Sequence, residues 1–203
     1  DFLNEIRKKG QKIGLIPTLG SIHEGHLSLV EKSKKINCFS LATIFVNPTQ
    51  FNDLEDFNKY PQNRDLDIVQ LKQIQCDALY FPQIEELYPE GINSHKTIFN
   101  YRDILCDKFR PGHFDGVTTV VKLLFDIIKP DHAFFGEKDF QQLKMIQKML
   151  VNNISSIVMH SCPSIRLSNG MSYSSRYRKF SISEEKIFND VANLLMQGIS
   201  DLR

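Results

Sequence analysis

The sequence predicts an α/β protein with an open, doubly wound and mostly parallel sheet, followed by a smaller C-terminal domain. Short β-rich runs alternate with helical periods along most of the chain, an order typical of parallel sheets with helices on both faces. The 203 residues, 41% hydrophobic and 24% charged, suit a folded protein with a sizeable core. From Ile165 onward the sequence changes to small polar and basic residues, so we expect one domain over residues 1–164 and a second over residues 165–203.

The N-terminal half is expected to begin the sheet. Phe39–Val46 is rich in β-branched and aromatic residues, which predicts a strand, and Asn47-Pro48 ends it. The expected strands here cover Lys12–Pro17, Phe39–Val46 and Ala78–Phe81, and the expected helices cover Glu24–Lys35 and Asn63–Gln75.

The C-terminal half continues the alternation. Its clearest helix has apolar residues at i, i+3, i+4, i+7 and i+11, namely Val117, Val120, Val121, Leu124 and Ile128. The expected elements are strands over Thr97–Phe99, His132–Phe135 and Ile154–His160, and helices over Phe114–Ile128, from an Asp139 cap to about Val151, and over Ser183–Ile199. Because open sheets of this kind bind ligands beyond the carboxyl ends of their strands, we expect the site at the point where the strand order reverses.

Charge and cysteine content narrow the class of protein. The 25 Lys and Arg against 24 Asp and Glu give a net charge of +1, which argues against a broad nucleic-acid-binding face. The thiols of Cys38, Cys76, Cys106 and Cys162 form no C-x-x-C pair, as is typical of a reducing compartment. No apolar run reaches the ~18 residues of a membrane span, and the N-terminus has no signal-peptide core. We therefore expect a cytoplasmic protein with neither nucleic acid nor membrane as a partner.

The most informative motif is P-T-L-G-S-I-H-E-G-H at residues 17–26, after the first expected strand. His23 and His26 are three residues apart where a helix is expected to begin, so their rings share one face. A helix N-terminus offers N–H groups and a partial positive charge, and two neutral imidazoles there can donate hydrogen bonds to a phosphate. The alternatives are a metal pair, for which no third ligand is evident, and two solvated histidines.

Two further motifs follow later strands. Asn47 and Gln50 in N-P-T-Q-F are amides, which suit a hydroxylated part of a substrate, and a plain Asn-Pro turn is the alternative. In F-G-E-K-D-F-Q-Q at residues 135–142, Lys138 can pair with phosphate. Asp139 can accept from ribose hydroxyls or cap the helix, and Gln142 lies one turn on.

Two loops complete the set of motifs. S-Y-S-S-R at residues 172–176 combines hydroxyls with a guanidinium and can act as a mobile phosphate clamp, with a solvated loop as the alternative. R-P-G-H-F-D-G-V at residues 110–117 leads into the clearest helix, and we interpret it as mainly structural, with Arg110 or His113 near a ligand as the alternative.

Several well-known motifs are missing. There is no G-x-x-x-x-G-K-[ST], no G-x-G-x-x-G and no G-x-S-x-G. A phosphate site without a protein nucleophile favours direct transfer between two bound substrates, in which positioning and charge stabilisation supply the catalysis.

Together and in this order, these motifs resemble the pantoate–β-alanine ligase (pantothenate synthetase) family of the H-x-G-H nucleotidylyltransferase superfamily. The resemblance spans nearly the whole chain, and the N-P-T-Q-F, R-P-G-H-F and F-G-E-K-D-F-Q-Q-L runs make it specific. It implies a Rossmann-like nucleotidylyltransferase fold, a homodimer, and Mg2+ carried on the ATP phosphates with no metal held by the protein. It also implies that residues 165–203 are only the start of a C-terminal lid domain.

The resemblance implies two half-reactions in one site. The carboxylate of pantoate attacks the α-phosphate of ATP, giving pantoyl adenylate and pyrophosphate, and the amine of β-alanine then displaces AMP. A carboxylate with a pKa near ~4 is already ionised at neutral pH, so the first step needs no protein nucleophile.

The resemblance also implies roles for individual residues. The implied catalytic residues are His26, His23, Lys138, Ser174, Ser175 and Arg176. The implied ATP-binding residues are Leu19, Gly20, His23, His26, Gly136, Glu137, Lys138, Asp139, Ile165, Tyr173, Ser174, Ser175 and Arg176. Gln50 and Gln142 are implied to hold pantoate and β-alanine, with Asn47 close by.

The sequence departs from the family pattern at four positions. Leu19 stands where Met is usual, a change that conserves volume. Leu167, Asn169 and Tyr177 replace Glu, Asp and Asn near the expected clamp loop.

Two other functions stay open. One is an adenylyltransferase that makes a dinucleotide, which would lack the paired amides and release no AMP. The other is a catalytically silent nucleotide-binding module.

Overall fold

The computed structural model describes residues 2–93, 100–153 and 155–202. The strand expected over Thr97–Phe99 lies outside the described residues, as does the first residue of the strand expected over Ile154–His160.

Five parallel strands form one sheet, which confirms the predicted fold class. The strands are β1 (Ile13–Thr18), β2 (Phe39–Ile44), β3 (Ala78–Tyr80), β4 (His132–Gly136) and β5 (Val158–Cys162), in the order β3-β2-β1-β4-β5. Leu15 of β1 pairs with Leu41 of β2 on one side and with Ala133 of β4 on the other. The chain runs outward from β1 to β3 and then crosses back to β4, so the strand order reverses between β1 and β4.

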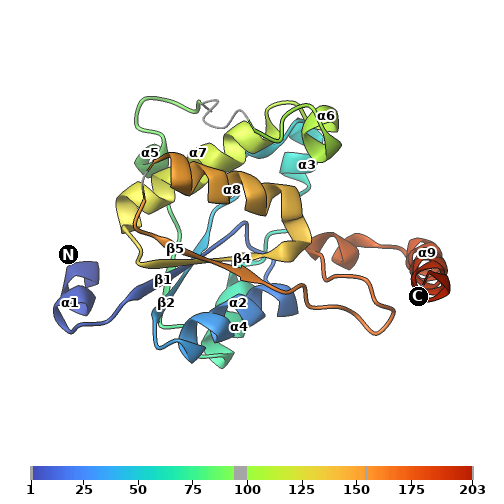
Figure 1. Cartoon of the computed structure of the whole chain (residues 1–203), viewed down its shortest axis with the longest axis horizontal. Coiled ribbons are helices and arrows are strands. Elements are labelled where there is room, and N and C mark those ends of the chain that lie inside the picture. Colours follow the sequence, from blue (N-terminus) through green and yellow to red (C-terminus); the bar gives the residue numbers. More distant parts are fainter. Residues whose placement is uncertain (1, 94–99, 154, 203) are drawn as a thin grey trace.

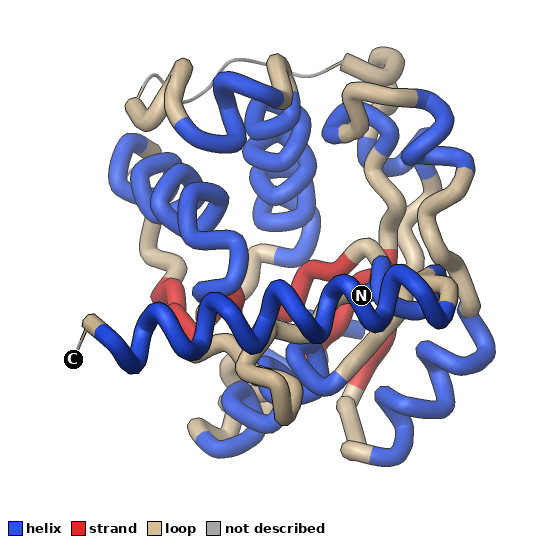
Figure 2. Tube along the Cα trace, turned by 90° about the vertical axis from the view of Figure 1, so that its right-hand side faces the viewer, coloured by secondary structure: helices blue, strands red, loops and turns tan. Residues whose placement is uncertain are grey.

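Helices cover both faces of this sheet (Figure 1). The helices are α1 (Phe2–Lys8), α2 (Glu24–Lys35), α3 (Leu54–Asn58), α4 (Arg64–Gln73), α5 (Ile84–Leu87), α6 (Leu105–Phe109), α7 (His113–Ile128), α8 (Phe140–Asn152) and α9 (Ile182–Asp201), with 3₁₀ turns at Pro48–Gln50, Glu137–Asp139 and Ser175–Lys179. In Figure 1, α2 and α4 lie below the sheet and α7 and α8 lie above it. In Figure 2, α9 crosses in front of the sheet as a separate rod.

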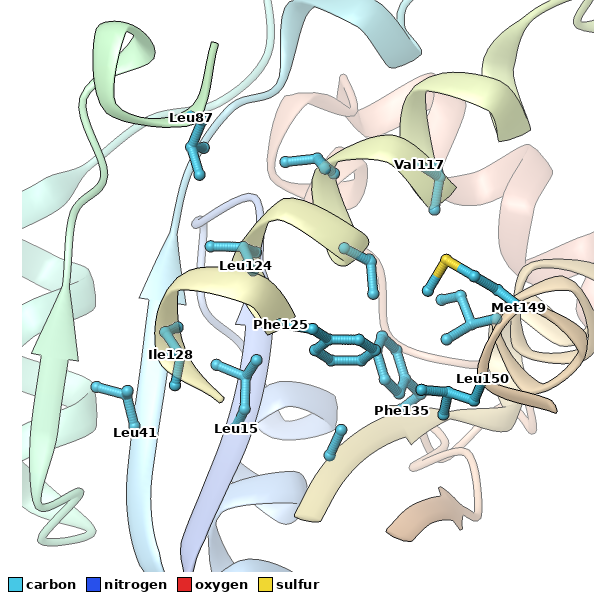
Figure 3. Close-up of a cluster of buried hydrophobic side chains, with 14 of the residues drawn as sticks. Leu15, Leu41, Leu87, Val117, Leu124, Phe125, Ile128, Phe135, Met149 and Leu150 are labelled. Carbon is cyan, nitrogen blue, oxygen red and sulfur yellow. The ribbon is translucent and has the colours of Figure 1, made fainter. Parts of the chain in front are cut away.

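The core is split into two layers because successive strand residues point to opposite faces. Leu15, Leu41 and Phe135 face α7 and α8, and Figure 3 shows Phe135 beside Phe125, with Leu15 and Leu41 near Ile128 at the end of α7. On the other face lie Ile16, Ala42 and Phe134, with apolar residues of α2 and α4 packed against them. The apolar period that predicts α7 therefore corresponds to its buried stripe.

The longer predicted elements are confirmed, and the differences have local causes. The helices α1, α3, α5 and α6 are short and were not predicted. The strand β5 begins later than expected because the chain must first turn out of α8. The Ser155 N–H donates to the Leu150 carbonyl at 3.1 Å, and the Ile157 N–H donates to Ser155 Oγ at 3.2 Å. The strand then continues to Cys162, which pairs with Gly136 of β4.

The segment after β5 folds around α9. Residues 166 and 172 form an isolated antiparallel bridge, and α9 buries only Ala192 fully among its described side chains. Three of the four departures from the family pattern, Leu167, Asn169 and Tyr177, lie here, and two of them contact α9. Asn169 Nδ2 donates to Asn189 Oδ1 of α9 at 2.6 Å, and the Tyr177 ring packs 4.5 Å from the Phe188 ring. Both side chains therefore fasten the loop to α9.

Two other observations concern the chain as a whole. No helix in the described part of the chain is long and apolar enough to span a lipid bilayer. The four cysteines are free thiols, and the two that are buried, Cys38 and Cys162, have a raised pKa because burial disfavours the thiolate.

Candidate active site

A cavity of about 250 Å3 lies at the carboxyl ends of β1 and β4, where the strand order reverses. Its wall includes Thr18 at the end of β1, Gly136 at the end of β4, and the segment from Pro163 to Ile165 that follows β5. The cavity therefore lies where the fold class predicts a ligand site. Ligands can reach the ends of several strands here because the flanking connections leave in opposite directions.

The turn after β1 leads directly into the H-x-G-H helix. Gly20 and Ser21 adopt positive φ values of 84° and 51°. A carboxylate from α4, Asp67, accepts hydrogen bonds from the N–H groups of Ser21 and Ile22 at 2.9 and 2.7 Å. The helix α2 then begins with His23 at its N-cap.

His23 and His26 form a reciprocal cap at the start of α2. The Gly25 N–H donates to His23 Nδ1 at 3.1 Å, and the His23 N–H donates to His26 Nδ1 at 3.3 Å. The two rings stack with centroids 4.0 Å apart. Because each Nδ1 accepts from a backbone N–H, each imidazole must carry its proton on Nε2. Both neutral rings are thereby prepared as Nε2–H donors, and both line the cavity.

Gln50 lines the cavity, whereas Asn47 lies behind it. Asn47 is fully buried, and its amide nitrogen donates to Gln50 Oε1 at 3.3 Å and to the Gly116 carbonyl at 3.1 Å. Its Oδ1 accepts from the hydroxyl of Tyr88 at 2.8 Å and from Thr49 Oγ1 at 3.1 Å. Asn47 therefore orients the Gln50 amide rather than reaching a ligand, which corrects its expected place in the binding wall.

Arg110 and His113, interpreted from the sequence as mainly structural, also line the cavity. His113 Nδ1 lies 2.6 Å from the Gln50 carbonyl, and His113 Nε2 lies 3.2 Å from Arg110 Nη1. Since a guanidinium can only donate, Nε2 accepts and Nδ1 carries the proton. Burial, with added repulsion from Arg110 and Arg176, lowers the pKa of His113, so this imidazole is held neutral.

The loop after β4 supplies a second wall of the cavity. Gly136, Lys138, Asp139 and Gln142 line it, and no atom lies within 4 Å of the place where a Gly136 Cβ would stand. Asp139 occupies the N-cap position of α8, as expected, but its carboxylate makes no capping hydrogen bond. The Asp139 carboxylate therefore makes no bond to the helix that would prevent it from accepting a hydrogen bond from a ligand.

The third wall is the loop 172–176. Ser175 Oγ lies 3.2 Å from the hydroxyl of Tyr60, and Arg176 Nη2 donates to Asp56 Oδ2 at 2.8 Å. Ser174 accepts from the Arg176 N–H at 3.3 Å, which begins the 3₁₀ turn. The loop is thus fastened to the segment around α3, and its Tyr173 ring lies 5.9 Å from the ring of His23.

The structure brings most of the sequence-predicted site residues to this one cavity. Those that line it are Leu19, His23, His26, Gln50, Gly136, Lys138, Asp139, Gln142, Ile165, Tyr173, Ser174, Ser175 and Arg176. Gly20, Asn47 and Glu137 do not line it. Sequence reasoning missed Tyr60, Phe51 and the α7 side chains Val117, Val120 and Val121. Phe51 belongs to the N-P-T-Q-F run, which offered a signal for it, whereas the apolar period of α7 predicts a helix without saying which residues meet a ligand.

The charge of the cavity favours an anion. Lys138, Arg110 and Arg176 are cationic, and Asp139 is the one carboxylate among the described residues that line the wall. In the described part of the chain, no three His, Cys, Asp or Glu side chains come together as a metal site. Fold and site together define an α/β protein of the H-x-G-H nucleotidylyltransferase class, with two histidines at a helix N-terminus that opens into the cavity.

Comparison with known proteins narrows this class to one family. The family model described as pantoate-beta-alanine ligase matches residues 1–202. Pantothenate synthetase of Thermodesulfovibrio yellowstonii is 41% identical over 198 residues, covering 98% of this chain and 71% of the relative. That of Buchnera aphidicola is 44% identical over 186 residues, covering 90% of this chain and 65% of the relative. The chain therefore belongs to the pantoate–β-alanine ligase family, whose members are ligases of pantothenate biosynthesis.

Solved structures agree with this assignment. Pantoate-beta-alanine ligase from Francisella tularensis, complexed with beta-gamma ATP and beta-alanine, superposes with a TM-score of 0.90 at 36% identity, covering 96% of this chain and 76% of that one. Pantothenate synthetase from Thermus thermophilus gives a TM-score of 0.84 at 36% identity, covering 92% and 69%.

Proposed function

We propose that the chain condenses pantoate with β-alanine at the expense of ATP, through a pantoyl adenylate. In the first step, a pantoate carboxylate oxygen bonds to the α-phosphorus of ATP as pyrophosphate leaves. In the second, the β-alanine ammonium first loses a proton, its nitrogen bonds to the acyl carbon as the bond to AMP breaks, and the nitrogen then loses a second proton, so that an amide and AMP are formed and both protons are released. The observation that carries the proposal is that the histidine pair and the two glutamines, Gln50 and Gln142, line one cavity.

The phosphate end of the site consists of donors. We infer that the Nε2–H groups of His23 and His26, together with the N-terminus of α2, stabilise the charge that builds on the α-phosphate. Lys138 and Arg176 add positive charge to the wall of the same cavity. Ser174 and Ser175 supply hydroxyls for the same phosphates, and Asp139 is placed to accept from the ribose.

The part of the site that we propose for pantoate contains two amide side chains. Gln50 Oε1 is engaged by Asn47, so the Gln50 amide nitrogen is the group left to donate to pantoate. Gln142 offers a second amide from the first turn of α8. Two neutral amide donors suit the carboxylate and hydroxyls of pantoate. A cationic side chain would pair with the carboxylate and make its attacking oxygen less nucleophilic, whereas an amide adds no charge.

The metal, the assembly and the domain boundary follow the same proposal. Mg2+ keeps several waters and binds substrate phosphates with few protein ligands, which fits a wall whose described residues include one carboxylate, Asp139. We infer that it enters on ATP and that it neutralises phosphate charge there. A homodimer is a part of the proposal that rests on the resemblance. The domain boundary between Ser164 and Ile165 rests on the change to small polar and basic residues there.

ATP–pyrophosphate exchange tests the first half-reaction. With pantoate present and β-alanine absent, labelled pyrophosphate is expected to appear in ATP, and omission of pantoate is expected to abolish the exchange. Addition of β-alanine is then expected to release AMP and pantothenate. Exchange that does not depend on pantoate would point to a dinucleotide-forming adenylyltransferase, and ATP binding without any exchange would point to a silent nucleotide-binding module.

A further inference from the structure

Asp67 is a buried carboxylate outside the cavity wall. It lies on α4 and is 1% exposed, and both of its oxygens accept from backbone N–H groups on a segment more than forty positions earlier in the chain. Oδ2 accepts from Ser21 at 2.9 Å, and Oδ1 accepts from Ile22 at 2.7 Å. A charged group at such depth is retained only where hydrogen bonds compensate its lost hydration.

The segment that Asp67 holds has an unusual backbone. Gly20 and then Ser21 take left-handed conformations, which a residue with a side chain rarely adopts. A Cβ at Gly20 would lie 3.0 Å from Asp67 Oδ2 and 2.9 Å from the Ile44 side chain. The turn therefore packs closely against α4 and β2, and the Asp67 carboxylate accepts from the N–H groups of Ser21 and Ile22.

The position of this turn sets the position of the histidines. Ile22 is fully buried and precedes the N-cap residue His23, so a shift of Ile22 would carry the start of α2 with it. The reciprocal cap between His23 and His26 depends on backbone N–H groups in that first turn. A displacement there would change both the ring positions and the hydrogen bonds that keep the proton on Nε2.

We propose that Asp67 is a positioning residue of the reaction, acting through the Gly20–Ile22 backbone to aim the Nε2–H groups of His23 and His26 at the nucleotide phosphate. The proposal rests on the proposed function for what the histidines do. It assigns Asp67 no contact with substrate, since it does not line the cavity.

The test compares Asp67→Asn with Asp65→Asn, which removes an exposed carboxylate from the same turn of α4. Asparagine keeps the shape but turns an NH2 group toward one of the two N–H donors. We expect kcat for pantoate-dependent exchange to fall about 10²-fold, since misplacement by about 1 Å costs this much, while the KM for pantoate changes less than about 2-fold. Asp65→Asn should behave as the parent chain. Asp67→Ser, whose smaller side chain leaves room for a bridging water, serves if Asp67→Asn does not fold.

Two readouts separate positioning from a loss of stability. In a double-mutant cycle with His26→Ala, the Asp67→Asn effect on kcat should become smaller, because one of the two imidazoles that it misplaces is gone. Independent multiplication of the two effects would overturn the proposal. Nitrogen chemical shifts of the imidazoles report the tautomers without any reaction, and Asp67→Asn should lose the Nε2–H pattern that the parent chain and Asp65→Asn retain. If the parent chain shows no exchange, the proposed function fails, and unchanged imidazole shifts in folded Asp67→Asn would still overturn this inference.

Discussion

Arg176 and Asp56 form an ion pair that joins the loop 172–176 to α3. Arg176 Nη2 donates to both carboxylate oxygens of Asp56, at 2.8 and 3.2 Å, and the two side chains are 51% and 40% exposed. The guanidinium carbon also lies 5.9 Å from the ring centre of Tyr60. The cation that we propose for phosphate binding thus already has a carboxylate partner.

Asp56→Asn is expected to strengthen ATP binding by about two- to five-fold, because an exposed ion pair worth roughly 0.2–1 kcal/mol no longer holds Arg176. Calorimetric titration with Mg2+-ATP at low and high salt measures the effect, which should shrink at high salt. Glu55→Gln on the same helix is the control and should bind ATP as the parent does. Weaker binding by Asp56→Asn would mean that the ion pair organises the loop for ATP rather than competing with it.

His26→Ala is expected to lower the rate of pantoate-dependent exchange by about 10²–10³-fold, since a donor to the developing phosphate charge is removed. His26→Gln should retain more activity, because its amide nitrogen can stand near the position of Nε2. Single-turnover exchange rates measure both, with circular dichroism to confirm the fold. His132→Ala, outside the cavity wall, is the matched control. Near-normal exchange by His26→Ala would contradict the assigned role.

Gly116→Ala is expected to destabilise the fold by about 1–3 kcal/mol and to raise the KM for pantoate, because α7 packs directly on the turn that carries Gln50. A Cβ there would lie 2.4 Å from the Thr49 carbonyl oxygen and 2.7 Å from the Gln50 nitrogen. Gly198→Ala meets no atom within 4 Å and should leave stability equal or higher, since alanine favours a helix. Urea unfolding of both variants provides the comparison, and equal midpoints would show that the turn can move aside.

His113 is expected to make stability depend on pH. Its pKa in the fold is lowered below the ordinary histidine value of about 6.5, chiefly by burial, so the unfolded chain binds the proton more readily. The stabilisation is complete above about pH 6.5 and is lost as the pH falls from there through the lower folded pKa. His113→Asn keeps a donor for the Gln50 carbonyl and should unfold in urea with a smaller difference between pH 7.5 and pH 5.5. The parent slope also contains His160, whose pKa is lowered too, so an unchanged slope in His113→Asn would assign the effect to His160.

Elements with a strong local pattern could be predicted from the sequence. The helix α2 was expected over Glu24–Lys35 and has those bounds, and α7 begins one residue earlier than expected. The short helices α3 and α6 span five residues each, too few for an apolar period to develop. Their positions depend on contacts such as that between Arg176 and Asp56, which join residues 120 positions apart.

The site shows the same division. Motifs at the ends of strands were enough to find most of the cavity wall, because parallel strands bring their carboxyl ends to one edge of the sheet. The place of Asn47 was predicted less well. An amide after a strand can face a ligand or the interior, and only the packing of Tyr88 and Gly116 around Asn47 turns it inward.

The parallel α/β fold, the family, and the residue types that we expect to meet phosphate and acid can be predicted without a structure, since all of these follow from local period and motif. That Asp67 supports the H-x-G-H turn, that Asn47 orients Gln50, and that His113 is held neutral in the wall can be seen only in the folded chain. Each of these depends on a hydrogen bond between a buried polar group and its partner elsewhere in the fold. In the low dielectric of the interior, a buried polar group without a partner is costly, so the pairing is required in the folded chain. It leaves no periodic pattern or motif in the sequence.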